Sequence, residues 1–396
     1  MANDKQLVLL VERIELPDRA YELAKSRYDD LGAWFDREEC SLDGNDPRIF
    51  VQGSFALGTA IRPPKEGQQY DLDLSCVLRS GVTRATHSQR QLKEMIGREL
   101  EGYRGYRQFD EPAEEKNRCW RLNYRDELGF HMDVVPGISA DTARRAALTL
   151  LMEQRGIARH LAQDVAAQAV WITDKRVPSY NRLSAEWPSS NPEGYVRWFL
   201  SRMSSPQPLL EKRAQIDDVP IYRRKTALQR VVQLLKAHRD SMFASAPDSK
   251  PTSIVLTTIA AAAYEANESL TDSMTRVLDA LEAFRRSNSD IVFNPVNPEE
   301  NFADRWKLPE YRPLRLKENF HHWIIQARAD FQYLMSAPGA VALMKRAQSA
   351  LKVRLDENAA AAALGAAAGP SVASQPPRPR QVSIQAPPRP WSAVQR

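Results

Sequence analysis

The stretch VQGSFALGTAIRPPKEGQQYDLDLSCVL, residues 51–78, decides the fold of this chain. It begins at Gln52-Gly53-Ser54, a Gly-Ser turn at the start of a short helix, and it ends in a strand that carries Asp71 and Asp73. Because side chains alternate across a strand, these two carboxylates share one face, while the leucine between them takes the other. The stretch therefore predicts a glycine turn beside a strand with two acidic side chains.

A third carboxylate comes from GFHMDVV, residues 129–135. The same alternation leaves three apolar side chains on one face of this strand and Asp133 on the opposite face. Three carboxylates that meet in one cleft repel each other unless a cation lies between them. Oxygen ligands of this kind suit Mg²⁺, with Mn²⁺ as a substitute, and Mg²⁺ in proteins usually also binds substrate phosphates. A turn with free N–H groups next to that cation would hold phosphate, so the set predicts a nucleotidyltransferase.

In this order the motifs resemble the catalytic signature of the polymerase-β-like nucleotidyltransferases. The resemblance is greatest to the bacterial CD-NTases (the SMODS family), relatives of cGAS and oligoadenylate synthase, and it covers roughly residues 5–355. A D-x-D pattern alone also occurs in glycosyltransferases and by chance, whereas the ordered set is specific. Stretches similar to the second half of the family are ITD…SNPEGYVRWF at 172–199, LLKAHRD and KPTSIVL within 234–256, and NPVNPEENFADRW at 294–306.

Asp71, Asp73 and Asp133 are the expected catalytic residues and metal ligands, together holding two Mg²⁺ ions. Two aspartates in a strand are unusual, and a buried Asp133 without a cation would be costly, so exposed strand carboxylates are the weaker reading. Asp133 is expected to orient or deprotonate the attacking sugar hydroxyl. His131 shares the Asp133 face, but a lone histidine is more often a packing residue than a ligand, and it is left out of the site.

Five further residues are expected to bind the substrate. Gln52, Gly53 and Ser54 would face it, with Ser54 touching the β- and γ-phosphates as well as capping a helix. The family carries a triphosphate-binding lysine and a serine at the start of the next helix, which Lys236 and Ser253 match. A lysine acts there as a compact charge toward phosphate, although Lys236 could instead be an ordinary helix lysine.

Other side chains cannot be ranked from the sequence. Contacts to the nucleotide are plausible for four of them: Asn191, Arg182, Arg239 and Lys250. Four aromatic residues are expected to serve core or loop packing rather than base stacking: Trp187, Tyr195, Trp198 and Trp306.

The composition is that of an ordinary soluble protein, with 43% hydrophobic and 27% charged residues in 396. No run approaches a membrane span, and three cysteines without metal-ligand spacing fit a reducing cytoplasm. Four arginines after residue 357 supply +4 of the net charge of +5, which leaves about +1 for the body. Net charge therefore gives no strong evidence for nucleic-acid binding, although the cluster at 223–225 could be a local footprint.

The predicted fold class is α+β, with a nucleotide cleft between two lobes. A polymerase-β-like catalytic sheet lobe with N-terminal spine helices is expected over residues 1–190 and a helical nucleotide-binding lobe over 191–357. A disordered Pro/Ala/Arg tail is expected over 358–396 because its composition cannot bury enough apolar surface to fold. Helices are predicted at 4–15, 18–38, 87–101 and 142–166 and strands near 48–53, 70–78, 117–124 and 129–135, and residues 165–173 could be a helix that runs into a last strand. From about 194 mainly helices are predicted, with breaks at Pro206, Pro208, Pro247, Pro251 and a loop at 295–298.

The expected reaction is metal-assisted nucleotidyl transfer, in which pyrophosphate leaves in line. The resemblance implies a cyclic di- or trinucleotide messenger that activates an effector in CBASS antiphage defence, with ATP the first substrate and GTP the next. A linear oligonucleotide, a nucleotidylated protein or RNA, and a catalytically silent nucleotide-binding scaffold remain alternatives. CBASS accessory proteins could act on the tail. The base, ring size, linkage and activating signal stay open.

Overall fold

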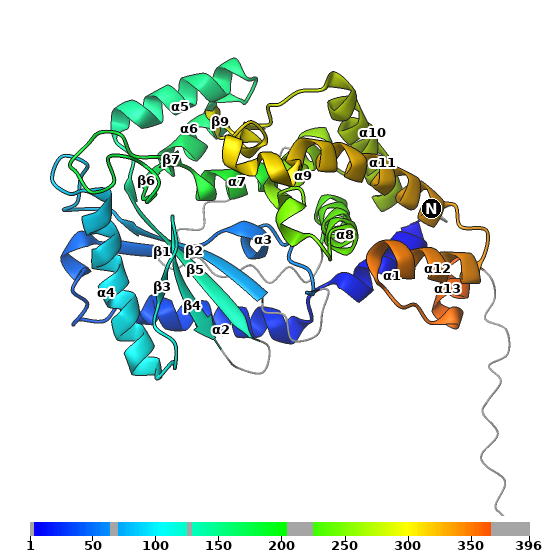
Figure 1. Ribbon diagram of the computed structural model, residues 1–396, viewed down its shortest axis with the longest axis horizontal. Coiled ribbons are helices and arrows are strands. Elements are labelled where there is room, and N and C mark those ends of the chain that lie inside the picture. Colours follow the sequence, from blue (N-terminus) through cyan, green and yellow to red (C-terminus); the bar gives the residue numbers. More distant parts are fainter. Residues whose placement is uncertain (1–3, 64–69, 125–128, 204–224, 366–396) are drawn as a thin grey trace, which may run out of the picture.

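A computed structural model of the chain describes residues 4–63, 70–124, 129–203 and 225–365 (Figure 1). Within these residues the first lobe is built on a mixed seven-stranded sheet with the order β1-β2-β5-β4-β3, extended by β6 on β5 and β7 on β6. The strands are β1 (Pro47–Val51), β2 (Tyr70–Leu78), β3 (Glu114–Glu115), β4 (Trp120–Tyr124), β5 (Phe130–Ser139), β6 (Val170–Ile172) and β7 (Ser189–Ser190).

The two central strands, β2 and β5, run parallel to each other and place Asp73 directly beside Asp133. β1 flanks β2 and β4 flanks β5, both in antiparallel register. Alternate side chains of the central strands, such as Leu72 and Met132, are fully buried on one face. The aspartates therefore emerge together on the opposite face, as the alternation predicts.

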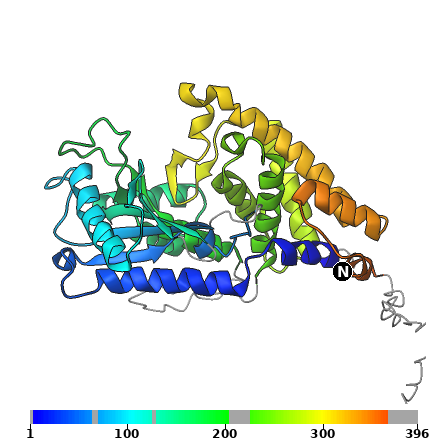
Figure 2. The same ribbon diagram turned by 60° about the horizontal axis from the view of Figure 1, so that its bottom comes forward.

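Helices α2 (Asp18–Phe35) and α4 (Gln89–Arg107) pack on the buried face of the sheet and close its core. The long α2 runs the length of the sheet lobe (Figure 2). Ser88 begins α4 with a capping box, because its hydroxyl accepts from the N–H of Gln91 and the Gln91 side chain accepts from the N–H of Ser88.

The second lobe is helical, and α8 lies at its centre in contact with α1, α9, α10, α11 and α12. Its elements are α7 (Pro192–Met203), α8 (Ala227–Met242), α9 (Ser253–Ala263), α10 (Leu270–Ser287), the hairpin β8 (Phe293–Asn294) and β9 (Asn297–Asn301), α11 (Leu316–Met335), α12 (Ala340–Leu351) and α13 (Glu357–Ala363). The short 3₁₀ turns of the chain are η1 (Asp43–Asn45), η2 (Pro247–Ser249), η3 (Asp304–Trp306) and η4 (Pro309–Leu314).

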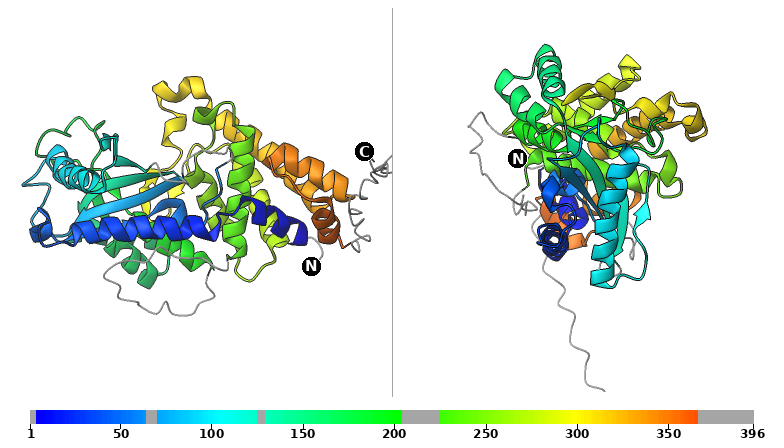
Figure 3. Two further views of the ribbon diagram at one scale, coloured as in Figure 1. Left: turned by 90° about the horizontal axis from the view of Figure 1, so that it is seen from below. Right: turned by 90° about the vertical axis from the view of Figure 1, so that its left-hand side faces the viewer.

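The packing of the two lobes crosses the predicted boundary at residue 190. Helix α1 (Asp4–Ile14) buries Leu7 and Leu10 in the core of the helical lobe, and only the following α2 returns to the sheet (Figure 3). The apolar sides of α5 (Thr142–Gln154) and α6 (Arg159–Ala167) join the same core. The N-terminus and the end of the sheet lobe are therefore shared between the lobes.

The folded chain also extends past residue 357, where a disordered tail was expected to begin. Helix α13 packs on α12 and α1, with Ala360 fully buried and Ala363 nearly so. Asp356 caps it by accepting from the N–H groups of Asn358 and Ala359. An alanine-rich segment has high helix propensity, and its small side chains let it approach two other helices closely. The rest of the predicted tail, from residue 366, lies outside the described residues.

The helices expected at 4–15, 18–38 and 87–101 and the strands expected in the first lobe are present, with ends shifted by a few residues. The single helix expected over 142–166 is two helices, α5 and α6, separated at Gly156, which has φ +82. The β8–β9 hairpin lies where a loop at residues 295–298 was expected to break the helical region.

Candidate active site

The glycine turn is pressed against the first carboxylate strand. Gly53 has φ +66, and a Cβ at this position would lie 2.1 Å from Oδ2 of Asp73. The N–H of Gln52 donates to the carbonyl oxygen of Asp73 at 2.9 Å, which holds the turn to β2. A residue with a side chain would therefore meet both an unfavourable backbone conformation and the carboxylate. The Gly-Ser turn and the D-x-D strand form one unit.

Asp73 occupies an electrostatically unfavourable place. Its pKa is raised to about 7, mainly by burial and then by the negative charges of Asp71 and Asp133, whereas Lys236 and Arg121 oppose the shift. Asp71 at the strand edge is exposed. The site thus holds more negative charge than its own cations balance, and a bound cation would lower the pKa of Asp73.

Asp133 is already paired with an arginine that the sequence analysis did not identify. Arg121 on β4 donates from Nε and Nη2 to the two carboxylate oxygens of Asp133, each at 2.7 Å. The two residues are register partners in the β4–β5 hairpin. Neighbouring Asp133 raises the pKa of the Arg121 guanidinium above its usual range. This ion pair partly replaces the cation that the three carboxylates were expected to require.

In the part of the chain that the structure describes, no three His, Cys, Asp or Glu side chains are gathered closely enough to hold a metal ion as they stand. Both oxygens of Asp133 also accept hydrogen bonds from Arg121. The chemistry of the donor set still fits Mg²⁺. Asp71 and Asp73 offer hard oxygen ligands on one face of β2, Asp133 lies beside them, and the raised pKa of Asp73 indicates a deficit of positive charge.

Gln52 and Ser54 differ in their surroundings. Gln52 borders the cleft, but its side-chain amide donates to the carbonyl of Leu74 at 3.2 Å and accepts from Oγ of Ser75 at 3.0 Å. It therefore fastens the turn to β2 instead of presenting a free amide to substrate. The half-buried Ser54 lies in α3 (Gly53–Ala56), and its hydroxyl makes no hydrogen bond with another described residue.

Lys236 is buried in the cleft, not at the surface of its helix. Its Nζ donates to the carbonyl of Thr59 at 2.8 Å, and burial lowers its pKa to about 8, with Arg239 adding to the effect. Two glutamines precede Lys236 on α8. Gln233, one turn earlier, donates to the carbonyl of Ala60, and Gln229, two turns earlier, donates to the carbonyl of Leu57. The helix thus holds the segment after the glycine turn, and two of the three N–H donors of Lys236 make no hydrogen bond with another described residue.

Ser253 begins α9 and belongs to a polar network near Lys236. Arg239 donates to its Oγ at 2.5 Å and also to Asp240, which in turn accepts from Lys250 at 3.2 Å. Of the side chains that sequence could not rank, Arg239 and Lys250 therefore lie with Ser253. Asn191 accepts from the N–H of Gly194 and caps α7, while Arg182 is exposed.

A cavity of about 270 Å³ joins the two lobes at this site. Gly53 and Asp73 border it from the sheet lobe, and the helical lobe closes it through Tyr195, Ile254 and residues of the β8–β9 hairpin. Tyr195 is buried and donates or accepts a hydrogen bond with Thr258, and like the buried Trp187 and Trp198 it packs in the core as expected. The described residues that line the cavity are Gln52, Gly53, Leu57, Asp73, Ser190, Asn191, Pro192, Tyr195, Val196, Ile254, Asn294, Glu300 and Phe302.

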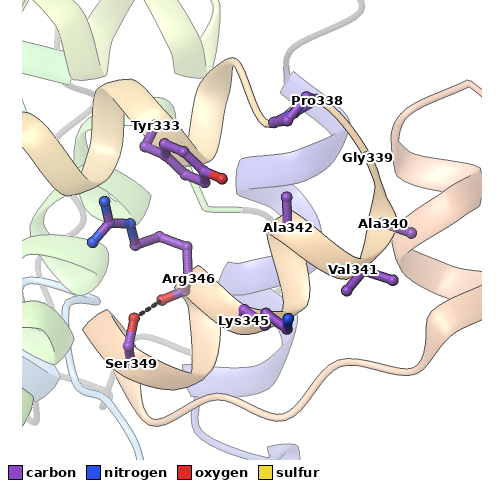
Figure 4. A pocket seen from close by; sticks show the side chains of 9 residues that line it. All are labelled: Tyr333, Pro338, Gly339, Ala340, Val341, Ala342, Lys345, Arg346 and Ser349. Atoms are coloured by element: carbon purple, nitrogen blue, oxygen red, sulfur yellow. Dashed lines mark hydrogen bonds between the residues drawn. The ribbon is translucent and has the colours of Figure 1, made fainter.

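A larger and more open hollow of about 850 Å³ lies elsewhere, where α11 meets α12 (Figure 4). Tyr333, Arg346 and Lys345 border it, and Arg346 is engaged with Asp330 and with the ring of Tyr333. None of the carboxylates of the cleft borders it. The volume of a hollow alone therefore does not locate the chemistry.

The fold and the residues around the cleft define a nucleotidyltransferase, and comparisons with known proteins agree. Residues 47–136 match the family model described as the nucleotidyltransferase domain of cyclic GMP-AMP synthase DncV-like proteins. The chain is 30% identical over 345 residues to a c-di-GMP synthase of Roseivirga ehrenbergii, covering 84% of this chain and 80% of the relative. It is 23% identical over 336 residues to the cyclic dinucleotide synthase CdnG of Bradyrhizobium diazoefficiens, covering 80% and 73%.

Among solved structures, the CD-NTase CdnG of Bradyrhizobium diazoefficiens in complex with GTP superposes with a TM-score of 0.60 at 17% identity, covering 92% of this chain and 98% of that one. This similarity confirms the predicted α+β fold. Together with the Roseivirga relative, it shows that the chain belongs to the bacterial CD-NTase family. Of the helices that the structure describes, none combines the length and the apolar composition that crossing a membrane requires.

Two features of the site were missed, and only the first left a signal in the sequence. Arg121 and Asp133 are register partners on β4 and β5, and opposite charges at such a pair are a recognisable signal. The stretch NPEEN carries Glu300 into the cleft, but only tertiary structure brings it to Asp73. Of the basic cluster at 223–225, Lys225 is buried against Glu15, and the two arginines lie outside the described residues.

Proposed function

We propose that this CD-NTase is a Mg²⁺-dependent cyclic oligonucleotide synthase that acts in CBASS antiphage defence. The observation that carries the proposal is the side-by-side placement of Asp73 and Asp133 on parallel strands, with the Gly53 turn packed against Asp73. The names of the relatives support a cyclic product, since they are described as cyclic dinucleotide synthases.

GTP is the first substrate that we propose, with ATP second. The sequence analysis placed ATP first. One relative is described as a c-di-GMP synthase and a similar structure as a complex with GTP, and both descriptions favour guanine. A cyclic dinucleotide is accordingly the product that we expect, formed by two successive transfers.

In the proposed reaction Asp71, Asp73 and Asp133 hold Mg²⁺, which supplies Lewis-acid stabilisation of the entering and departing oxygens when bound. Asp133, oriented by its two hydrogen bonds from Arg121, accepts the proton of the attacking ribose hydroxyl or orients that hydroxyl. Lys236 and the hydroxyl of Ser54 hold the β- and γ-phosphates, which leave as pyrophosphate when the hydroxyl bonds to the α-phosphorus. Most of the rate then comes from positioning and electrostatics.

Incubation of the purified protein with labelled GTP, ATP and Mg²⁺, followed by phosphatase, tests the proposal. A phosphatase-resistant product is expected from wild type. A sensitive product would indicate a linear oligonucleotide, and labelled protein or RNA would indicate nucleotidylation of an acceptor. No product with any nucleotide would favour a silent nucleotide-binding scaffold. The role in defence is tested by phage challenge of cells that carry the complete system, with Asp73→Asn as the inactive control.

A further inference from the structure

The cleft contains an acidic side chain that the proposed chemistry does not use. Glu300 on β9 borders the same cavity as Gly53 and Asp73, but it comes from the helical lobe. The cavity wall near it is mainly apolar and includes Ile254 and Phe302. An acidic group in such a place needs a hydrogen-bonding or cationic partner.

The partners of Glu300 within the protein are few. Asn294 donates from Nδ2 to Oε2 of Glu300 at 2.8 Å. The carboxylate forms no salt bridge with a lysine, arginine or histidine of the described residues; burial raises its pKa most, while its hydrogen bonds with Asn294 and Asn297 and the charge of Arg118 oppose that rise. A half-buried carboxylate without a cation is costly, so a ligand with hydrogen-bond donors would be favoured beside it.

The hairpin that carries Glu300 is held in place from both lobes. Asn294 accepts from the N–H of Val296 at 3.0 Å, which fixes the turn that supports Glu300. Arg144 on α5 donates to Asn297 at 3.0 Å and to Ser189 at 3.1 Å, so the hairpin is fastened to β7 of the sheet lobe. The acceptor is thereby positioned before any ligand binds, which reduces the cost of binding.

We propose that Glu300 determines the base preference of the enzyme by accepting hydrogen bonds from the Watson–Crick edge of guanine. This inference rests on the proposed function, because it assigns the base of a nucleotide bound in the same cavity. An ionised carboxylate only accepts hydrogen bonds. Guanine offers it two adjacent donors, N1–H and the N2 amino group. Adenine presents an acceptor at N1, which the carboxylate repels, so Glu300 selects against ATP.

The test compares Glu300→Gln with wild type by measuring kcat/KM for GTP, ATP and ITP, each as the labelled nucleotide under initial-rate conditions. Inosine keeps N1–H but lacks the N2 amino group, so ITP reports on that one donor. The glutamine amide keeps the volume of glutamate but replaces one acceptor with a donor. The matched control is Glu299→Gln, the same exchange one residue away at an exposed position.

Wild type is expected to prefer GTP over ATP by about a hundredfold or more and GTP over ITP by about tenfold. Glu300→Gln should lower the GTP-to-ATP ratio by about tenfold or more and remove most of the GTP-to-ITP difference. Glu299→Gln should change both ratios by less than about twofold, because Glu299 is exposed outside the cavity lining and glutamine can still accept a hydrogen bond from Arg144.

An equal loss of kcat/KM for all three nucleotides in Glu300→Gln would overturn the proposal, since it would indicate a contact to ribose or a purely structural bond to Asn294. Unchanged ratios with unchanged activity would overturn it as well. These outcomes leave the proposed function intact, because product still forms. Failure of wild type to form product from any nucleotide would instead contradict the proposed function.

Discussion

Replacing Asp73 with asparagine should stabilise the protein at alkaline pH while abolishing its activity. The pKa of the Asp73 carboxyl is raised from 3.8 to about 7 by burial and by the neighbouring aspartates. In the unfolded chain this group ionises near its ordinary value. Between these two pKa values the folded state therefore binds more protons than the unfolded state, and stability falls as pH rises from about 4 to 7.

The size of the effect follows from the shift. About three pH units at about 1.4 kcal/mol each give a cost of up to about 4 kcal/mol for ionised Asp73 above pH 7. For a chain of this size, about 1 kcal/mol changes Tm by about 1–2 °C. Asp73→Asn cannot ionise, so its Tm relative to wild type should be higher at pH 8 than at pH 5 by up to about 5 °C.

The assay is thermal unfolding at pH 5 and pH 8, in EDTA and in excess Mg²⁺. In Mg²⁺ at pH 8 wild type should regain stability, whereas Asp73→Asn should gain less because it lacks a ligand. Asp29→Asn on α2 serves as the control and should follow the pH dependence of wild type. An Asp73→Asn difference that is the same at both pH values, or a loss of stability at pH 8, would refute the electrostatic reasoning.

Three other predictions concern the turn, the lysine and the C-terminus. Gly53→Ala should reduce product formation by about a hundredfold or more in rate assays, because its Cβ would collide with Asp73; near-normal activity would show that the turn can shift. The pKa of Lys236 is lowered to about 8, so kcat/KM for GTP should fall as pH rises above 8. Lys236→Met should lower kcat/KM at pH 7 and remove that fall. A pH profile unchanged by the substitution would contradict a role for the Lys236 charge. Truncation after Gly365 should leave Tm and synthesis near wild type. Truncation after Glu357 should lower Tm by several degrees, because it removes α13. Equal Tm values for the two truncated proteins would contradict the packing of that helix.

The central part of the site could be predicted because local patterns determine it. Alternation along two strands places Asp71, Asp73 and Asp133 on one face, and a Gly-Ser turn before the first strand predicts a close backbone approach. The lysine of α8 was found through its helical position and the family resemblance. The structure adds the reason for its burial: side chains of α8, Lys236 among them, donate hydrogen bonds to the backbone carbonyls that follow the glycine turn.

What sequence reasoning missed depends on contacts between segments distant in the chain. Glu300 and Asp73 are more than two hundred residues apart and line the same cavity, beside a hairpin that Arg144 of α5 holds through Asn297. The assignment of α1 to the helical lobe likewise follows from tertiary packing, since an amphipathic helix does not show which core it faces. Gln52, expected to face substrate, does border the cleft, but the sequence does not reveal that its amide also bonds to β2.

The most direct test of the account is the intact mass of the phosphatase-treated product made by purified wild-type protein from GTP and Mg²⁺, with Asp73→Asn run in parallel. We expect wild type to yield a species with the mass of two guanylate units, one water lighter than linear pGpG. Asp73→Asn should yield none. A linear product from wild type, or the same cyclic product from Asp73→Asn, would contradict the claim that these strands carry out cyclic nucleotide synthesis.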